Sequence, residues 1–533
     1  MTHPLRTVLA VALTALLGLA VAQETVFRMA TFEPNSLDPA IGGPGYQEYA
    51  NLYETLVEAY AKDGELRPLA ADSWEISEDG TVFTFTLREG LRWSDGEPLT
   101  MQHYYDGWMR MLDPATASYA PQNLFAIKNG EAFNLGEITD RDAVGLEVLD
   151  DLTLRVTLER PTPFFLRSVG RQEFFPMRLD LIALHGDQWM EAGNHVGNGP
   201  YMLETWQHDQ RMVFVKNPYY EGIWKDNRHV DRIEFTLLGD PWGQSVPGFE
   251  TGELDVGIVP PADLERVRND PVLSQRLQPL PISGAVIMVF DTGNGVTADV
   301  LVRRALAQAI DYDVLANAVL RGAFAPAASF SPPELESHDP GTRLPTDVEA
   351  ARALLAEAGY PGGQGFPPFT LYYWSLQRES LLAQAIQAMW SQNLGIQVQL
   401  QSLEPAAMTA YRNSRADEPF DAYLALNWAG MADPHQFHNN QLDPARNVRH
   451  SRYDDEAYVE WVRRALSHPD LDERVAMYRE AEAFINQDVP ILSLVYEART
   501  WLVAEHVENF GDVVTSIAEM LRVAAPPGLR VTR

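Results

Sequence analysis

The chain has 533 residues, a length that suggests roughly two to four domains and a large apolar core. Hydrophobic residues make up 46% and charged residues 22%, as in ordinary globular proteins, so a disordered chain is excluded. Lys and Arg number 41 against 74 Asp and Glu, which gives a formal net charge of −33. Because contacts with phosphates and anionic lipids need positive charge, we predict no nucleic-acid partner, no anionic-membrane partner and a soluble monomer.

The first 22 residues have the composition of an export signal. Arg6 precedes an apolar run from Val8 to Leu19, and Ala20-Val21-Ala22 supplies the small residues of a cleavage site. The run is shorter than the roughly 20 apolar residues that a membrane-spanning helix needs. Since the sequence has no cysteine, disulfides, thiolate metal sites and the lipid attachment of bacterial lipoproteins are excluded. We predict that removal of residues 1–22 as a signal peptide leaves a soluble periplasmic or extracellular protein.

The first half of the chain is rich in strand patterns. Glu78-Asp79-Gly80 is typical of a turn, and Phe83, Phe85 and Leu87 then alternate with polar residues. This period of two predicts a half-buried strand that follows a hairpin turn. Similar patterns predict strands at 25–31, 154–158, 212–216 and 233–237.

Downstream of Pro281 the hydrophobic period becomes helical. Segments 348–358 and 381–394 each stop at a glycine, which is typical of a helix C-terminus. Further helices are predicted at 301–320 and 472–484, and a strand at 396–400. Helices followed by strands indicate an α/β domain.

Motifs that would indicate catalysis are absent or incomplete. Asp291-Thr292-Gly293 resembles half of an aspartic-protease dyad, but the sequence has no second copy. His435 and His438 are spaced for a zinc site on a helix, yet Pro434 disfavours a continuous helix there, so we expect surface or cleft histidines. Phosphate-binding loops, dinucleotide fingerprints and nucleophile elbows are missing from the sequence. We predict no enzymatic activity, no metal and no cofactor.

A series of segments resembles one family of transport proteins. The longest match runs from Pro68 to Thr100 and contains Leu69-Ala70-Ala71-Asp72-Ser73-Trp74 and Trp93-Ser94-Asp95-Gly96. Further matches are at 36–39, 52–57, 197–201, 217–220, 252–255, 302–311 and 353–360. In order and spacing these segments resemble the extracytoplasmic solute-binding proteins of oligopeptide, dipeptide and nickel ABC transporters, the peptide-binding-protein family.

The resemblance implies an α/β fold of the periplasmic-binding-protein type. Two lobes would be joined by a two-strand hinge, with an extra domain inserted in the first lobe. The implied division is a signal peptide at 1–22, lobe I at 23–68 with 188–280 and 491–533, an inserted domain II at 69–187, and lobe II at 281–490. The chain would cross between the lobes near 280–283 and 490–493, and the lobes would close around a solute.

One loop departs from the family pattern. Peptide-binding members have Trp-x-x-Asp followed closely by Asp/Glu-Pro, and the first Asp grips the α-ammonium group of the peptide. This loop runs from Trp428 to Pro434, is one residue shorter, and has Met431 in the position of that Asp. Asp433 aligns with the acid before the proline, so the resemblance implies that the ammonium clamp is missing unless the shorter loop turns Asp433 inward. A buried cation needs a carboxylate, and an oligosaccharide or other neutral solute is therefore an alternative ligand.

Candidate ligand-binding residues come from two regions of the chain. They are Glu33, Asn35, Tyr46, Trp428, Ala429, Gly430, Met431 and Asp433. Glu33 occupies the place where an acidic residue lines the pocket of peptide-binding members. Trp428 and Met431 would suit an uncharged solute.

The predicted function is capture of a small solute by hinge closure and its delivery to an ABC permease in the inner membrane. The resemblance favours an oligopeptide as that solute, with an oligosaccharide or other neutral solute as the alternative. Three alternative functions of a different class are compatible with the same scaffold: a periplasmic chaperone, a sensory receptor and a secreted hydrolase. The hydrolase lacks a nucleophile or metal motif in this sequence.

Overall fold

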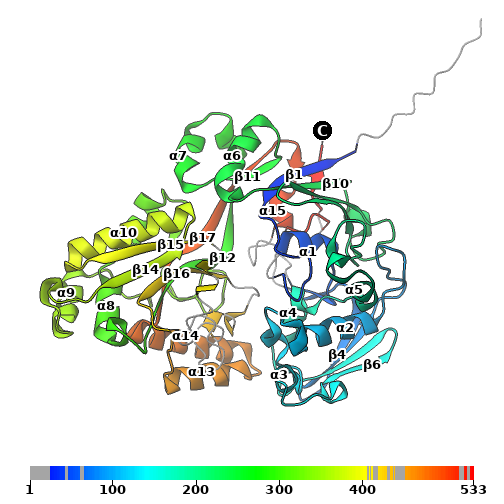
Figure 1. Cartoon of the computed structure of the whole chain (residues 1–533), viewed down its shortest axis with the longest axis horizontal. Coiled ribbons are helices and arrows are strands. Elements are labelled where there is room, and N and C mark those ends of the chain that lie inside the picture. Colours follow the sequence, from blue (N-terminus) through cyan, green and yellow to red (C-terminus); the bar gives the residue numbers. More distant parts are fainter. Residues whose placement is uncertain are drawn as a thin grey trace, which may run out of the picture.

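The computed structural model covers most of the chain (Figure 1). The described residues are 24–42, 46–59, 65–404, 407–408, 410–411, 418–428, 433–435, 437–438, 451–514, 521–524 and 528–532. The predicted export signal and the loop residues Ala429, Gly430 and Met431 lie outside them. Within the described part, no helix has the length and apolar character needed to cross a membrane.

The first sheet has four strands in the order β1-β10-β9-β8. Their bounds are β1 (Val26–Thr31), β8 (Tyr201–Gln207), β9 (Arg211–Lys216) and β10 (Arg232–Leu237). β1 runs parallel to β10, with Phe27 opposite Ile233. Buried residues alternate with partly exposed ones along β1, because only one face of this strand contacts the core. The strands predicted at 25–31, 212–216 and 233–237 are confirmed.

A second, antiparallel sheet has the order β4-β5-β7-β6. Its strands are β4 (Ala71–Ile76), β5 (Val82–Leu87), β6 (Leu146–Asp150) and β7 (Thr153–Thr157). Gly80 has a φ of +69° in the turn between β4 and β5, a conformation that favours glycine. Phe83, Phe85 and Leu87 are buried, so the strand predicted after this turn is confirmed.

The third sheet is the largest, in the order β11-β17-β12-β16-β14-β15 with β13 beside β17. Its strands are β11 (Val256–Ile258), β12 (Leu277–Phe290), β13 (Ala325–Pro326), β14 (Phe369–Trp374), β15 (Val398–Leu403), β16 (Ala422–Trp428) and β17 (Ile491–Val503). Its main helices are α8 (Val300–Gln308), α9 (Val348–Glu357), α10 (Gln377–Leu394), α13 (Glu456–Leu466) and α14 (Leu471–Asp488).

Helices cover both faces of this third sheet (Figure 1). Val286 and Met288 of β12 pack with α8, α9 and α10, whereas Ala285 and Ile287 pack with α13 and α14. A strand that is buried on both faces reads as a continuous apolar run, as β12 and β16 do. The predicted α/β organisation of this part of the chain is confirmed.

The single helix predicted at 301–320 is wrong. α8 ends at Gln308, and a separate wide-turn helix spans Val314–Val319. The Asp311 carboxylate accepts a hydrogen bond from the Val314 N–H at 2.9 Å. This side-chain acceptor competes with the helical backbone and starts a new turn, which the apolar period alone does not reveal.

Smaller elements complete the fold. The other helices are α1 (Tyr46–Leu52), α2 (Met101–Leu112), α3 (Gly130–Asn134), α4 (Phe165–Val169), α5 (Leu179–His185), α6 (Pro241–Thr251), α7 (Pro261–Asn269) and α15 (Phe510–Val513). The short strands are β2 (Val57–Glu58), β3 (Arg67–Pro68), β18 (Val507–Glu508) and β19 (Arg530–Val531). We call the elements around the first sheet lobe I, those around the second sheet domain II, and those around β12 to β16 lobe II. The domain limits implied by the resemblance stay a prediction.

Two long strands, β12 and β17, connect lobe I with lobe II. Their first paired stretch joins 277–281 to 498–502, where β17 also pairs with β11. Their second joins 285–289 to 491–496, where β12 also pairs with β16. The register shifts between Pro281 and Ala285, so the ladder is interrupted between the two bodies. An interrupted ladder of this kind is where a two-strand connection can bend.

Candidate ligand-binding site at the hinge

A pocket that is partly open to solvent lies beside the β12–β17 connection. It forms where β17 and β11 meet the first turns of α6, α7 and α10. Its walls are mostly apolar and include Trp242, Val259, Phe324 and Leu376. A concave, apolar space with a few charged groups at a junction between lobes is typical of a ligand-binding site.

Buried charged groups fix one wall of this pocket. Arg378, in the first turn of α10, donates to one Glu379 oxygen from two nitrogens, at 3.0 and 2.6 Å. Its third nitrogen pairs with Glu497 of β17. The Trp428 indole N–H donates to the other Glu497 oxygen. Glu497 therefore joins β17, β16 and α10 into one hydrogen-bonded unit.

The charges in this wall compensate one another. Burial favours a neutral Glu497, but the charges of Arg378 and Arg499 and the Trp428 hydrogen bond keep the Glu497 pKa below its ordinary value. Burial likewise opposes charge on Arg378, and the two neighbouring carboxylates raise its pKa above the ordinary value. The Arg499 guanidinium lies 4.4 Å from the centre of the Trp242 ring. The wall thus stays ionised without carrying a large surplus of either sign.

One buried carboxylate oxygen in the wall has no hydrogen-bond donor among the described residues. Within the described residues, the Glu379 Oε2 atom is buried and accepts no hydrogen bond. Buried carboxylate oxygens normally have donors, and an unsatisfied one costs free energy. Glu379 therefore offers an acceptor to a ligand that enters the pocket.

Glu33 lies near the pocket but has protein partners of its own. Its carboxylate accepts hydrogen bonds from Trp206 Nε1 at 3.1 Å, His208 Nδ1 at 2.7 Å and the Asp209 N–H at 2.6 Å. Burial acts to raise the Glu33 pKa, but these donors lower it below its ordinary value. The neighbouring Phe32 ring packs edge-on against Trp242, with centroids 5.0 Å apart, so this loop abuts the pocket wall.

The remaining predicted residues are distributed unevenly. Asn35 is exposed, Tyr46 begins α1, and Trp428 reaches the pocket wall through Glu497. Asp433 is buried on the other face of lobe II, where both of its oxygens accept bonds from Arg474 at 2.6 Å. The described structure thus connects Trp428 to the pocket wall through Glu497 and the Glu33 loop to it through Phe32 and Trp242, and it leaves Asp433 apart.

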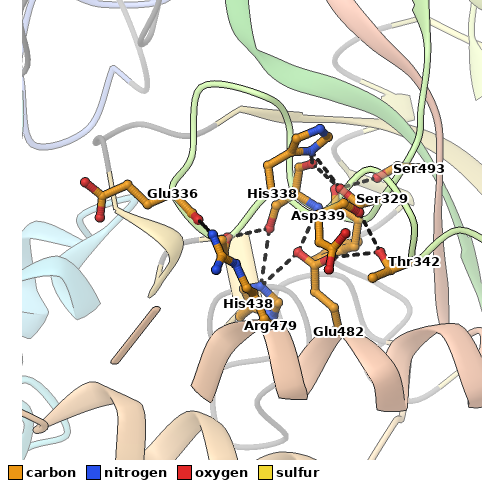
Figure 2. Close-up of polar contacts among 12 residues, drawn as sticks. Ser329, Glu336, His338, Asp339, Thr342, His438, Arg479, Glu482 and Ser493 are labelled. Atoms are coloured by element: carbon orange, nitrogen blue, oxygen red, sulfur yellow. Dashed lines mark hydrogen bonds and ion pairs between the residues drawn. The ribbon is translucent and has the colours of Figure 1, made fainter. Parts of the chain in front are cut away.

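The expectation of surface histidines at 435 and 438 is wrong, because both side chains are buried. His435 lies where lobe II meets Phe164 of domain II, so a place between the lobes stays a prediction for it. His438 lies against the segment 329–342 and α14 (Figure 2). Its Nε2 is 3.4 Å from the Ser331 hydroxyl and 3.6 Å from Glu482 Oε1. A catalytic relay needs the hydroxyl and the carboxylate on different ring nitrogens, and here both approach the same one. The group is therefore a packing contact that holds segment 329–342 on α14.

Sequence reasoning missed the charged wall of the pocket. Glu497 and Arg499 lie two apart within the apolar run of β17, so they share one face of a strand. Charged residues at this spacing in a buried strand indicate an internal ion pair or a site, and this signal was available. Arg378 and Glu379 gave no such signal, because adjacent charges at a helix start are common on surfaces.

Comparisons with known proteins agree on one family. The model of the bacterial extracellular solute-binding proteins, family 5, matches residues 65–448. The probable deoxycholate-binding periplasmic protein YgiS of Escherichia coli is 31% identical, and the match covers 92% of this chain and 91% of YgiS.

Solved structures agree with this assignment. The murein tripeptide binding protein MppA of Escherichia coli is 27% identical and superposes with a TM-score of 0.84, covering 96% of this chain and 99% of MppA. The unliganded open form of MppA is also 27% identical and superposes with a TM-score of 0.71, covering 96% of this chain and 98% of that form of MppA. The predicted two-lobed fold of the periplasmic-binding-protein type is confirmed by these superpositions. Members of the family bind solutes and are not enzymes. The chain belongs to the bacterial extracellular solute-binding proteins of family 5.

Proposed function

We propose that this protein captures a short peptide in an ABC importer and passes it to the permease in the membrane. The observation that carries the proposal is the pocket at the β12–β17 connection, where a change of angle between the lobes opens or closes the space. The murein tripeptide binding protein MppA, named for a peptide ligand, has the same architecture. Export through the predicted signal, a periplasmic location, a monomeric state and the absence of catalysis belong to the same proposal.

Glu379 takes the part of the missing ammonium clamp in this proposal. Asp433 is engaged by Arg474, so its carboxylate is already neutralised. Glu379 is one of the residues that line the pocket, its buried Oε2 has no donor among the described residues, and an amino group would supply one. The apolar walls around Trp242 and Phe324 would hold the peptide's side chains.

Calorimetry with tripeptides tests this proposal. A free tripeptide should bind more tightly than its N-acetylated form. Glu379→Gln should lower the affinity for the free form by about tenfold to hundredfold, because it removes a charge-assisted hydrogen bond. Glu357→Gln, at an exposed position of α9, is the matched control and should have no effect. Absence of binding to any peptide would overturn the proposed ligand class, and equal binding of both forms would overturn the role of Glu379.

A neutral or amphipathic solute is the second candidate, because the pocket walls are mostly apolar. The relative YgiS is named for probable binding of deoxycholate, which has a large apolar body. The same titrations with deoxycholate and with an oligosaccharide pool decide between the candidates. Heat of binding for one of these, without heat for tripeptides, would replace the peptide by that solute.

A further inference from the structure

An aromatic contact bridges domain II and lobe II at a distance from the pocket. Phe164, directly before α4, stacks on the imidazole of His435 with centroids 4.5 Å apart and ring planes 20° apart. The guanidinium of Arg474 in α14 lies 5.2 Å from the centre of the same Phe164 ring. Figure 1 shows α14 in one of the two bodies and α4 in the other.

The burial of Phe164 depends on lobe II. Its neighbour Phe165 packs inside domain II, 4.9 Å from Phe83 and 6.2 Å from Phe174 between ring centroids. The Phe164 ring, in contrast, contacts His435 and Arg474, which both belong to lobe II. The ring is nevertheless only 9% exposed. Separation of domain II from lobe II would therefore return an apolar ring to water.

The surface that receives Phe164 is rigid. Asp433 accepts two hydrogen bonds from Arg474, each 2.6 Å long, and one from the His435 backbone N–H at 2.8 Å. The His435 imidazole and the Tyr478 hydroxyl are hydrogen-bonded at 3.0 Å. These bonds hold the imidazole and the guanidinium in place against one aromatic ring. Asp433 thus acts here as a positioning residue for Arg474.

We propose that Phe164, His435 and Arg474 form a latch that stabilises the closed arrangement of the lobes. The proposal rests on hinge closure as the binding motion. The structure superposes less well on the unliganded open form of MppA, with a TM-score of 0.71, than on the other MppA structure, with 0.84, and this difference supports a lobe arrangement unlike that open form. The latch acts where domain II meets lobe II, whereas the ligand acts at the β12–β17 connection.

The latch changes affinity without contact with the ligand. Apparent affinity is the intrinsic affinity multiplied by the closed fraction of the protein. An aromatic stack supported by a cation is sufficient to change the open-to-closed ratio about threefold to thirtyfold. Loss of the latch should therefore weaken every ligand by the same factor.

Single-molecule fluorescence transfer in the absence of ligand tests the latch. Because the chain has no cysteine, Leu135→Cys in domain II and Val314→Cys in lobe II supply two labelling sites, both exposed. Phe164→Ala should shift the distribution of the ligand-free protein towards the open state. Leu184→Ala, at a position that is 72% exposed, should leave it unchanged.

Two further variants keep the test decisive. Phe164→Leu retains an apolar side chain of similar volume but removes the aromatic stack, so it should also shift the ligand-free protein towards the open state. It takes the place of Phe164→Ala if that variant folds poorly. As a single variant, His435→Ala should shift the ligand-free protein towards the open state. Combined with Phe164→Ala it should cause no further shift, because both substitutions remove the same contact. Unchanged distributions for all Phe164 variants, or additive effects with His435→Ala, would overturn the latch. Because no ligand is present, this result is independent of the ligand class proposed above.

Discussion

Buried carboxyl groups determine how lobe I responds to pH. Burial raises the pKa of Glu48 to about 7, although the Thr31 hydroxyl donates a hydrogen bond to it at 3.2 Å. Burial also raises the pKa of Glu54 to about 7, and the Tyr220 hydroxyl donates to its carboxylate. In both cases the fold retains a proton that the unfolded chain releases at a lower pH. The free energy of unfolding therefore falls as pH rises from the ordinary value of 4.5 towards 7.

Glu48→Gln should remove the free-energy cost of burying the charged Glu48 carboxylate. The amide oxygen keeps the acceptor for Thr31 but has no charge to bury. The free energy of unfolding should rise by about 3 kcal/mol at pH 8 and change little at pH 4.5. Urea unfolding at both pH values checks this result, with the exposed Glu357→Gln as the control. An equal gain at both pH values would contradict the raised pKa.

Glu497→Gln tests the charged wall of the pocket. It removes the charge that compensates the buried Arg378, and breaking a buried pair costs about 3–5 kcal/mol. The loss should be complete above pH 4.5, and it should shrink as pH falls through the lowered pKa of Glu497. Glu460→Gln breaks the exposed pair with Arg463 and should cost less than about 1 kcal/mol. Equal losses in urea unfolding would show that the wall contributes no more than a surface pair.

The candidate site was predictable only in part from the sequence. Trp428 was identified from a motif, and the structure adds its hydrogen bond to Glu497, which lies far along the chain. Asp433 belongs to the same motif, yet its partner Arg474 lies on α14 and directs it away from the pocket. A motif fixes residue types along the chain. It does not fix which side chain from another element arrives to neutralise them.

At the scale of elements, the connection between the lobes depends on close packing. Gly284 lies within the register shift of β12, between Pro281 and Ala285, and opposite Trp428 of β16. A Cβ atom on Gly284 would lie 2.3 Å from the Trp428 ring, which is closer than real contacts allow. The absence of a side chain at 284 therefore lets Trp428 reach Glu497.

Gly284→Ala should displace the Trp428 ring. We expect a loss of about 1–3 kcal/mol in the free energy of unfolding, as for overpacked cores. The intrinsic tryptophan fluorescence should also change, because the indole loses its charged partner. Gly239→Ala is the matched control, since nothing lies within 4 Å of a Cβ there. A Gly284 variant that behaves like the Gly239 variant would contradict the packing argument.

Elements with a clear hydrophobic period were predictable, and those with local side-chain competition were not. The strand at 82–87 and the helix at 348–357 follow from alternating residues and from a terminal glycine. The break after Gln308 does not, because it depends on hydrogen bonding by Asp311. The pairing of β1 with β10 also could not be read from the sequence, since a parallel pair is set by tertiary packing.

At the scale of the whole molecule, the three larger apolar cores fall into two bodies, and a smaller core with Val246 and Leu264 lies beside the β12–β17 connection. One continuous core joins the first and second sheets, including Phe27 and Phe85. Separate cores cover the two faces of the third sheet, including Leu424 and Tyr423. Bodies with their own cores that share only a few connecting strands tend to unfold as separate cooperative units.

Calorimetry of the ligand-free protein should therefore resolve two transitions. Phe85→Ala should lower the temperature of one transition, and Leu424→Ala should lower the temperature of the other. Each truncation should cost about 2–5 kcal/mol in its own body, because each residue is fully buried. A single transition that both variants shift equally would contradict the division into two bodies.

Both outer ends of the described chain belong to the same half of the molecule. The Phe27 ring of β1 lies 6.4 Å from Phe510, and Val531 of β19 pairs with Val507 of β18. The end marked C lies beside β1 (Figure 1). A tether or a fused reporter at either end would therefore hold lobe I and leave lobe II free to swing. A protein immobilised in this way could serve as a sensor in which solute capture is read as movement of the unattached half.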